Sequence, residues 1–200
     1  MHRRSFLAAL TAAVAVAEPA SAKISLADLS RYLNGLKTVR GAFTQINADG
    51  TLTTGLLYLN RPGRMRFEYD PPDRSLVMAG GGQVAIFDPK SNTPPEQFPL
   101  RRTPLNIILQ RNVDLGRTDM VVAHRDNGNT TSIVAQDPEH PEYGNIELVF
   151  SANPIQLRQW IVTGQGGDQV TVILGEVTEG MRLSASLFDI VQEVNRRFGD

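Results

Sequence analysis

Residues 52–69 read LTTGLLYLNRPGRMRFEY, and this stretch decides the fold class. From Arg64 to Tyr69, charged and apolar side chains alternate strictly, which is typical of a strand with one buried face. The RPG sequence at residues 61–63 is a turn signal, and the apolar residues before it also share faces with a period of two. The stretch therefore predicts two antiparallel strands joined by a turn.

Further segments of the chain have the length and composition of short strands. Turn signals such as GGG, DNGN and GQGGD lie between them, and no long helix does, which favours a meandering antiparallel sheet. The proline-rich segment 89–102 is predicted to be a loop, and residues 187–190 a short strand before a loose or helical end. The predicted strands are residues 75–79, 83–88, 117–125, 130–136, 145–151, 155–163 and 169–177.

Two helices are expected. Residues 25–39 place leucines at helical spacing behind Ser25, a residue that commonly caps helices. A second helix is predicted to begin with Thr103 as its cap and Pro104 at its first position, and it continues with the almost wholly apolar residues 105–109. Because so short a helix is unstable alone, we expect it to lie against an apolar surface.

The composition excludes several classes of function. The chain has 200 residues, with 20 Lys and Arg against 21 Asp and Glu, and this balance argues against a nucleic-acid-binding protein. Hydrophobic residues make up 41%, enough for a packed core. The chain has no cysteine, which excludes disulfides, thiolate metal sites, a cysteine nucleophile and a lipid-modified cysteine.

The first 22 residues have the pattern of a secretion signal. Arg3 and Arg4 precede an apolar stretch at residues 6–17, and ASA at residues 20–22 is a small-residue cleavage pattern. We therefore expect a signal peptide at 1–22 and a single exported mature domain at 23–200.

The sequence contains no motif that predicts catalysis. Neither a Gly-x-Ser-x-Gly elbow nor a His-Glu-x-x-His sequence occurs. His140 lies in the acidic segment DPEHPE at residues 137–142, but the spacing there follows neither a zinc nor a calcium site. We expect a binding protein and not an enzyme, with no metal and no cofactor.

The apolar faces of the predicted strands and helices allow two interpretations. The helices could pack on the sheet in an ordinary filled core, which the composition alone favours. Alternatively, the sheet could curve around a cavity that the helices cover. Methionines such as Met65 and Met78 could line an adaptable ligand surface, but methionine fills ordinary cores equally well.

Four stretches match a known protein family in the family's order: TVRGAFTQ (38–45), GLLYLNRPGRMRFEY (55–69), VAIFDP (84–89) and QFPLRRTPL (97–105). In them the chain resembles the LolA family of periplasmic outer-membrane lipoprotein carriers. The resemblance implies a mainly β fold with α-helices: an incomplete, strongly curved antiparallel β-barrel closed by a helical lid over a hydrophobic cavity. With that fold, the lid comprises Thr103, Pro104, Leu105, Ile108 and Leu109, and the predicted cavity lining is Leu52, Leu56, Tyr58, Met65, Phe67, Tyr69, Met78 and Ile86.

The family's arginine before the turn proline falls on Arg61. In the family this arginine is associated with hydrogen bonding to the lid, so the resemblance implies a gating role. The residues alone allow a salt bridge at the end of a strand equally well. The family often has aromatic residues where this chain has Met65 and Phe67, and Met65 keeps the apolar character without the ring.

The resemblance also implies a periplasmic location and the function of a soluble carrier. Such a carrier takes acylated lipoproteins from an inner-membrane ABC-type release complex and delivers them to the outer membrane, to a lipoprotein receptor where one exists. Because the chain lacks a cysteine for lipid anchoring, we expect the monomeric shuttle and not the anchored receptor. The main alternative is a periplasmic binding protein for other lipids or hydrophobic ligands. A lipid hydrolase and an interaction module with a filled core are further alternatives.

Overall fold

The computed structural model describes residues 23–116 and 119–199, and the predicted signal peptide at 1–22 lies outside them. Short strands dominate the described chain, with few helices between them. In chain order the elements are α1 (Leu26–Gly35), β1 (Thr38–Ile46), β2 (Leu52–Asn60), β3 (Arg64–Tyr69), β4 (Leu76–Gly80), β5 (Gln83–Phe87), β6 (Glu96–Pro99), the 3-10 helix η1 (Leu100–Arg102), α2 (Asn106–Leu109), β7 (Val121–Asp126), β8 (Thr130–Gln136), η2 (Pro141–Tyr143), β9 (Asn145–Ala152), β10 (Ile155–Thr163), β11 (Gln169–Glu179), η3 (Ala185–Phe188) and α3 (Ile190–Phe198).

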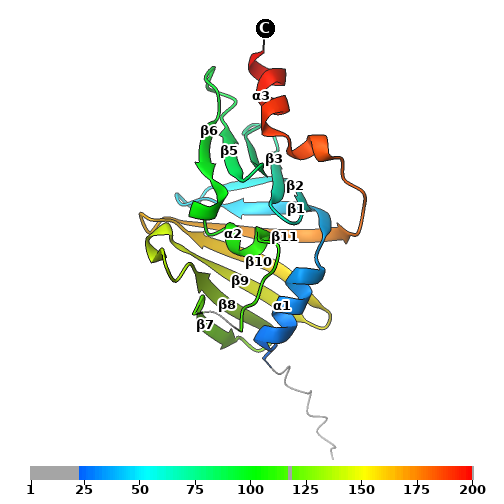
Figure 1. Ribbon diagram of the computed structural model, residues 1–200, viewed down its shortest axis with the longest axis vertical. Helices are drawn as coiled ribbons and strands as arrows, with labels where there is room; N and C mark the ends of the chain where they lie inside the picture. The colour runs from blue at the N-terminus through cyan, green and yellow to red at the C-terminus, as the bar shows by residue number, and fades with distance from the viewer. Residues whose placement is uncertain (1–22, 117–118, 200) are drawn as a thin grey trace, which may run out of the picture.

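The strands form one antiparallel sheet in the order β6-β5-β4-β3-β2-β1-β11-β10-β9-β8-β7. β1 pairs with β11, so strands from the two ends of the described chain meet in the middle of the sheet. The two edges, β6 and β7, do not pair with each other, and the curved sheet stays open (Figure 1). The predicted fold class, an incomplete and curved antiparallel barrel with helices, is confirmed.

Two glycines allow close contacts at the centre of the sheet. A Cβ atom at Gly41 would lie 2.6 Å from Cγ1 of Val177, beside a register shift in the β1–β11 pairing. A Cβ atom at Gly55 would lie 2.1 Å from the carbonyl oxygen of Glu68 and 2.8 Å from the ring of Phe43. Bulges and glycines of this kind let a sheet bend where a larger residue would prevent it.

The helices lie on both faces of the sheet. We define the concave face as the one that α1 and α2 cover (Figure 1). Leu29 and Leu33 of α1 are fully buried in the core on this face. Ile190 of α3 packs in a separate cluster with Leu76 and Met78 on the opposite, convex face. Among the described residues, no helix combines the length and the apolar character that crossing a bilayer requires.

The predicted cap of the first helix is confirmed. The Ser25 hydroxyl oxygen accepts a hydrogen bond from the backbone N–H of Asp28 at 3.1 Å, as an N-cap residue does. The helix ends at Gly35, earlier than predicted, because β1 begins at Thr38.

Two local predictions are wrong. The segment predicted as a loop at 89–102 contains β6 and η1. Its prolines favour a loop, but β6 is an edge strand, where proline is tolerated. The segment predicted as a strand at 187–190 instead forms the end of η3 and the start of α3. Of the predicted strand 117–125, the first two residues lie outside the described chain, and β7 covers the rest from Val121.

Candidate functional site

The concave face of the sheet is an apolar surface. Alternate residues of β1 and of the strands on both sides of the β1–β11 pair point to the concave face. They are buried because α1 and α2 cover them. These residues are Val39, Phe43, Leu57, Leu59, Met65, Phe67, Ala79, Ile133, Ala135, Ile146, Leu148, Phe150, Leu157 and Trp160.

Aromatic rings form the floor of this surface. The ring of Phe67 meets Phe43 and Trp160 edge-on, with centroids 5.1 and 6.1 Å apart. Phe43 also meets Tyr69 edge-on at 5.1 Å. Such T-shaped contacts are favourable beyond the area they bury, so they give the floor a defined geometry.

Tyr69 brings a polar group to the floor. Its hydroxyl donates a hydrogen bond of 2.7 Å to Oε1 of Gln45. Burial raises the pKa of Tyr69 to about 12, so the hydroxyl stays neutral at physiological pH. The partnered hydroxyl therefore adds no charge to the apolar surface.

The segment 103–109, which we call the lid, lies against this floor. Ile107, Ile108 and Leu109 are 5%, 1% and 1% exposed and belong to the main core. Leu105 is half-buried and packs against the same core. The lid thus occupies, with its own side chains, space that the family resemblance assigns to a cavity.

The lid begins differently from the prediction. Thr103 does not cap α2; its hydroxyl donates a hydrogen bond of 2.8 Å to the carbonyl oxygen of Leu100 and closes η1. Pro104 lies before α2, whose N-cap position is taken by Leu105 without any side-chain hydrogen bond. An uncapped helix of 4 residues has little stability of its own, so burial must hold it in place.

Two hydrogen bonds attach the end of the lid to the turn between β2 and β3. Nη2 of Arg61 donates to the carbonyl oxygen of Gln110 at 2.6 Å, and the backbone N–H of Gly63 donates to the carbonyl oxygen of Leu109 at 2.8 Å. Arg61 is buried, and its Nε has no hydrogen-bond partner among the described residues. Burial lowers the pKa of the Arg61 guanidinium.

The structure does not contain the alternative salt bridge at Arg61. Within the described chain, no carboxylate forms an ion pair with this residue. The side chain that the resemblance assigns to gating therefore contacts the lid and not a neighbouring strand end.

Half of the predicted lining residues lie on the concave face. Met65 and Phe67 are buried there, and Tyr69 is half-buried beside them. Ile86 points to the same side, because it pairs with Val77, which in turn pairs with Phe67. It is, however, 39% exposed and not covered like the others.

The other predicted lining residues do not line this surface. In β2, Leu56 and Tyr58 alternate with the buried positions and point to the convex face, and Leu52 is 67% exposed. Met78 is fully buried, but in the convex cluster beneath α3. The predicted phase of β2 is therefore wrong.

The correct phase of β2 is set by its partner strand. Leu57 is paired with Phe67, and Leu59 with Met65, so these leucines share the concave face. Sequence reasoning missed them because residues 56–59 are apolar in both phases. The alternation of β3, which has one apolar phase, would select them once the two strands are paired in register.

The covered floor has little free volume. A cavity of about 20 Å³ lies between α1 and the sheet and is lined in part by Tyr32, Leu57 and Trp160. This is room for about one water molecule and not for an acyl chain. In the described conformation, the space over the floor is therefore filled by the protein's own side chains.

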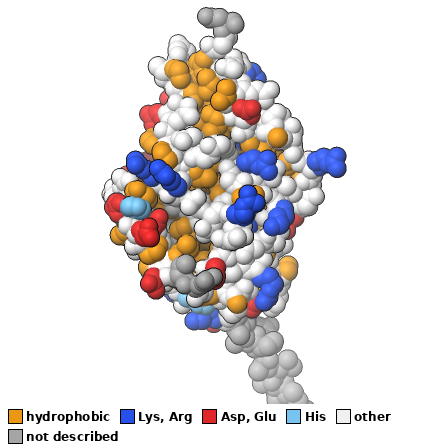
Figure 2. Space-filling model, in the orientation of Figure 1, with side chains coloured by type: hydrophobic (Ala, Val, Ile, Leu, Met, Phe, Trp, Pro, Cys, Tyr) orange, Lys and Arg blue, Asp and Glu red, His pale blue; other side chains and the backbone are white. Residues whose placement is uncertain are grey.

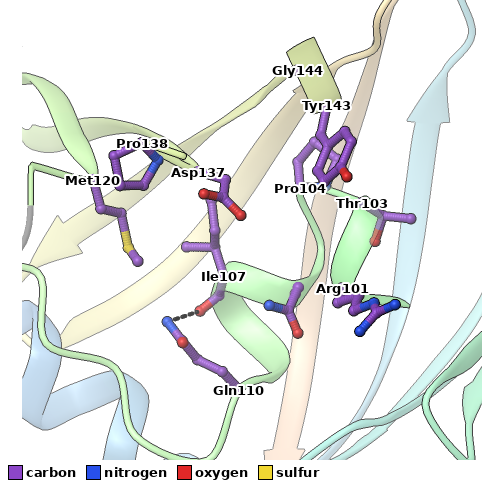
Figure 3. A pocket seen from close by; sticks show the side chains of 11 residues that line it. Arg101, Thr103, Pro104, Ile107, Gln110, Met120, Asp137, Pro138, Tyr143 and Gly144 are labelled. Atoms are coloured by element: carbon purple, nitrogen blue, oxygen red, sulfur yellow. Dashed lines mark hydrogen bonds between the residues drawn. The ribbon is translucent and has the colours of Figure 1, made fainter. Parts of the chain in front are cut away.

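A larger pocket, of about 130 Å³, lies beside the lid (Figure 3). Pro104 and Ile107 of the lid and the adjacent Gln110 line it, together with Met120 in the turn before β7 and Tyr143 of η2. The lid is thus not packed on all sides.

The described residues offer no metal cluster. No group of three or more His, Asp and Glu residues could hold a metal ion there. Nε2 of His124 lies 2.9 Å from the carbonyl oxygen of Ile24, and His140 stacks on Tyr143 at the surface beside Glu142.

A comparison of the sequence with family models identifies one family. A family model described as outer membrane lipoprotein carrier protein LolA matches residues 34–191. The outer-membrane lipoprotein carrier protein of Pseudomonas aeruginosa is 24% identical over 208 residues, which cover 96% of this chain and 98% of that protein. That of Xylella fastidiosa is 41% identical over 71 residues, only 33% of this chain and 34% of that protein. A solved LolA superfamily protein from Nitrosomonas europaea has a TM-score of 0.42 at 8% identity, over 83% of this chain and 98% of that chain.

Proposed function

This chain belongs to the LolA family of outer membrane lipoprotein carrier proteins, and on that premise we propose that it carries acylated lipoproteins across the periplasm. It accepts them from an inner-membrane ABC-type release complex. It shields their acyl chains beneath the lid and delivers them to the outer membrane, to a receptor where one exists. The protein binds and transfers its cargo without a chemical reaction.

The burial of the lid carries this proposal. Ile107, Ile108 and Leu109 cover the aromatic floor with roughly twelve apolar side-chain carbons. This number is close to the carbon count of one acyl chain. An acyl chain that enters beneath the lid would cover the same surface that these side chains cover now. The closed conformation supplies a replaceable cover, which is what a carrier needs when it is empty.

The lid is a bounded segment between two fixed points. On one side the backbone N–H of Leu100 donates to the carbonyl oxygen of Gly82 at 2.9 Å. On the other side the Asn34 side chain bonds both backbone groups of Val113, at 2.8 and 2.9 Å. Residues 103–112 can therefore swing away while η1 and α1 stay in place.

The energies favour reversible binding. Removing an acyl chain of about 14 methylenes from water is worth on the order of 11 kcal/mol, at about 0.8 kcal/mol per methylene. Exposing the three buried lid side chains costs about 1.5–3 kcal/mol each, or about 5–9 kcal/mol together. The difference of a few kcal/mol lets the carrier bind a cargo chain and still release it.

The single tryptophan gives a direct test of acyl-chain binding. Trp160 is 1% exposed and contacts Phe67 on the floor. We expect a brominated fatty acid to quench the fluorescence of Trp160 saturably, because the bromine must come close to the floor. An unchanged emission at saturating fatty acid would contradict the proposal.

A second measurement separates lipoproteins from other lipids as the cargo. Mass spectrometry of the protein purified gently from the periplasm should find acylated lipoprotein. Depletion of the protein should leave lipoproteins at the inner membrane. If depletion leaves lipoprotein sorting intact while fatty acids still quench Trp160, the alternative of a general lipid-binding protein is correct.

A further inference from the structure

Exposed cations lie at both ends of the lid. Arg101 and Arg102 belong to η1, immediately before the lid, and Arg111 follows α2. Lys37 lies nearby, because its carbonyl oxygen accepts the backbone N–H of Arg61 at 2.8 Å, and Arg61 in turn holds the end of α2. We call Lys37, Arg101, Arg102 and Arg111 the cationic rim. Figure 2 shows Lys and Arg side chains across the middle of this face.

Within the described chain, the fold uses one charge of the cationic rim: Nζ of Lys37 donates a hydrogen bond of 2.7 Å to the carbonyl oxygen of Asn34 near the end of α1. All of its members are exposed, and none forms an ion pair within the described chain. Asp114 and Asp137 lie at its margin, but each accepts hydrogen bonds from backbone N–H groups of its own loop. Since the chain as a whole has a net charge of −1, the rim is a local accumulation of positive charge and not a consequence of a basic sequence.

Apolar side chains are exposed beside the rim. Phe98 is 44% exposed, and it lies in β6, which leads directly into η1. Ile86 in the neighbouring strand β5 is 39% exposed on the same side of the sheet. Figure 2 shows hydrophobic side chains gathered in the upper part of the molecule, where Figure 1 places β5 and β6. An exposed aromatic ring next to arginines is the combination that binds the interface of a lipid bilayer.

We propose that the cationic rim and Phe98 dock the lid face onto an anionic phospholipid surface. Three of the four rim cations are arginines, whose planar guanidinium groups bind phosphate through paired hydrogen bonds. Each cation at such a surface strengthens binding by about fivefold. A bilayer supplies both the phosphates that suit the rim and the apolar layer that suits Phe98, whereas an acidic protein surface would supply only the former.

Docking in this orientation places the lid against the membrane. An acyl chain could then move between the bilayer and the concave face without crossing water. The lid side chains that opening exposes would enter an apolar medium. The purpose of the docking rests on the proposed carrier function, but the docking itself needs no cargo and can be tested alone.

The test is flotation of the purified protein with vesicles. Vesicles of phosphatidylcholine with about one third phosphatidylglycerol should carry the protein at low salt, while pure phosphatidylcholine vesicles should not. Raising the salt concentration should release it. The double variant R101E/R102E should bind at least about tenfold more weakly, and Phe98→Ser should weaken binding several-fold.

The matched control reverses two cations on the convex face. Arg40 and Arg158 are exposed and follow buried concave residues in β1 and β10, so R40E/R158E changes the net charge equally at the other face. This variant should bind within about twofold of the unchanged protein. Equal losses in both double variants would show that only net charge matters and would overturn the proposal.

Two further outcomes would also overturn it. One is equal binding to neutral and anionic vesicles. The other is that the protein floats with neither vesicle although its circular dichroism shows that it is folded. That result would indicate that the rim binds an acidic protein partner instead. Quenching of Trp160 by brominated fatty acid, measured on the same variants, reports the carrier function separately. Lost flotation with retained quenching is the expected result for R101E/R102E.

Discussion

The guanidinium of Arg61 donates a 2.6 Å hydrogen bond to the carbonyl oxygen of Gln110, and it thereby joins the β2–β3 turn to the end of the lid. The same guanidinium leaves its Nε without a hydrogen-bond partner among the described residues, in a buried position. One charge-assisted bond is thus offset by a desolvation cost. A contact with this balance holds the lid closed only weakly, which suits a gate.

The first prediction removes this contact. Arg61→Leu should shift the lid towards the open state, because the bond to Gln110 is lost while the buried position becomes apolar. We expect tighter binding of brominated fatty acid, by about fivefold to tenfold, and slower release to acceptor vesicles. A charge-assisted hydrogen bond is worth about 1.5–3 kcal/mol, and the relief of the desolvation cost reduces that figure.

Arg40→Leu is the control for this change, because Arg40 is exposed and lies on the convex side of β1. It should leave binding and release unaltered. If Arg61→Leu binds and releases fatty acid as the unchanged protein does, Arg61 has no gating role.

The second prediction compares two buried leucines. Leu109 in the lid is 1% exposed, and Leu76 in the convex cluster is 2% exposed. Leu109→Ala should weaken the closed state and raise the affinity for fatty acid several-fold. Leu76→Ala should lower the free energy of unfolding by about 2–5 kcal/mol, as in other cores, without raising that affinity. Urea unfolding and Trp160 quenching measure the two effects, and equal affinities in both variants would contradict the lid hypothesis.

Some of these structural features can be predicted from the sequence and others cannot, for physical reasons. The alternation of β3 predicts its faces correctly because one phase is charged, whereas β2 is apolar in both phases and needs its partner to choose. The lid is readable as a short apolar helix, but its start is not, because Thr103 caps the preceding 3-10 turn instead. Local propensity cannot distinguish two adjacent turns that compete for one hydroxyl.

The covering of the convex face could not be predicted from the sequence at all. Besides the apolar cluster around Ile190, it includes the ion pair between Arg66 and Glu193, whose positions differ by 127 in the chain. From the sequence, Arg66 reads as a residue on the solvent face of β3. Only the fold shows that η3 and α3 lie over this position and bury it.

The third prediction concerns pH and this covering. Burial opposes ionisation of Glu193, but hydrogen bonds from Arg197 and Arg196 and the charge of Arg66 outweigh it and lower the pKa of its carboxyl below the usual 4.5. A carboxyl with a lowered pKa stabilises the fold above its unfolded-state pKa, and this contribution is lost as the pH falls through the folded-state value. The urea midpoint should therefore fall below about pH 4.5.

Glu193→Gln should reduce that dependence, since the amide cannot titrate. It should also lower the stability at pH 7 by about 1–3 kcal/mol, because the buried Arg66 and its neighbours lose a charged partner. Glu176→Gln, at an exposed position in β11, is the control and should keep the midpoint and its pH dependence. A steep acid loss that persists unchanged in Glu193→Gln would exclude this carboxyl as its source.

The last prediction tests how tightly the convex covering fits. A Cβ atom at Gly80 would lie 2.2 Å from the carbonyl oxygen of Phe188, so Gly80→Ala must push η3 and α3 away from β4 and should lower the free energy of unfolding by about 1–3 kcal/mol. Gly35→Ala at the end of α1 meets nothing within 4 Å and should instead raise it by about 0.4–1 kcal/mol, because alanine restricts the unfolded chain. Since Gly80 contacts the convex layer and not the lid, its substitution should leave Trp160 quenching unchanged. If Gly80→Ala lowers fatty-acid binding as much as stability, the two faces of the sheet are coupled and the lid does not open independently of α3.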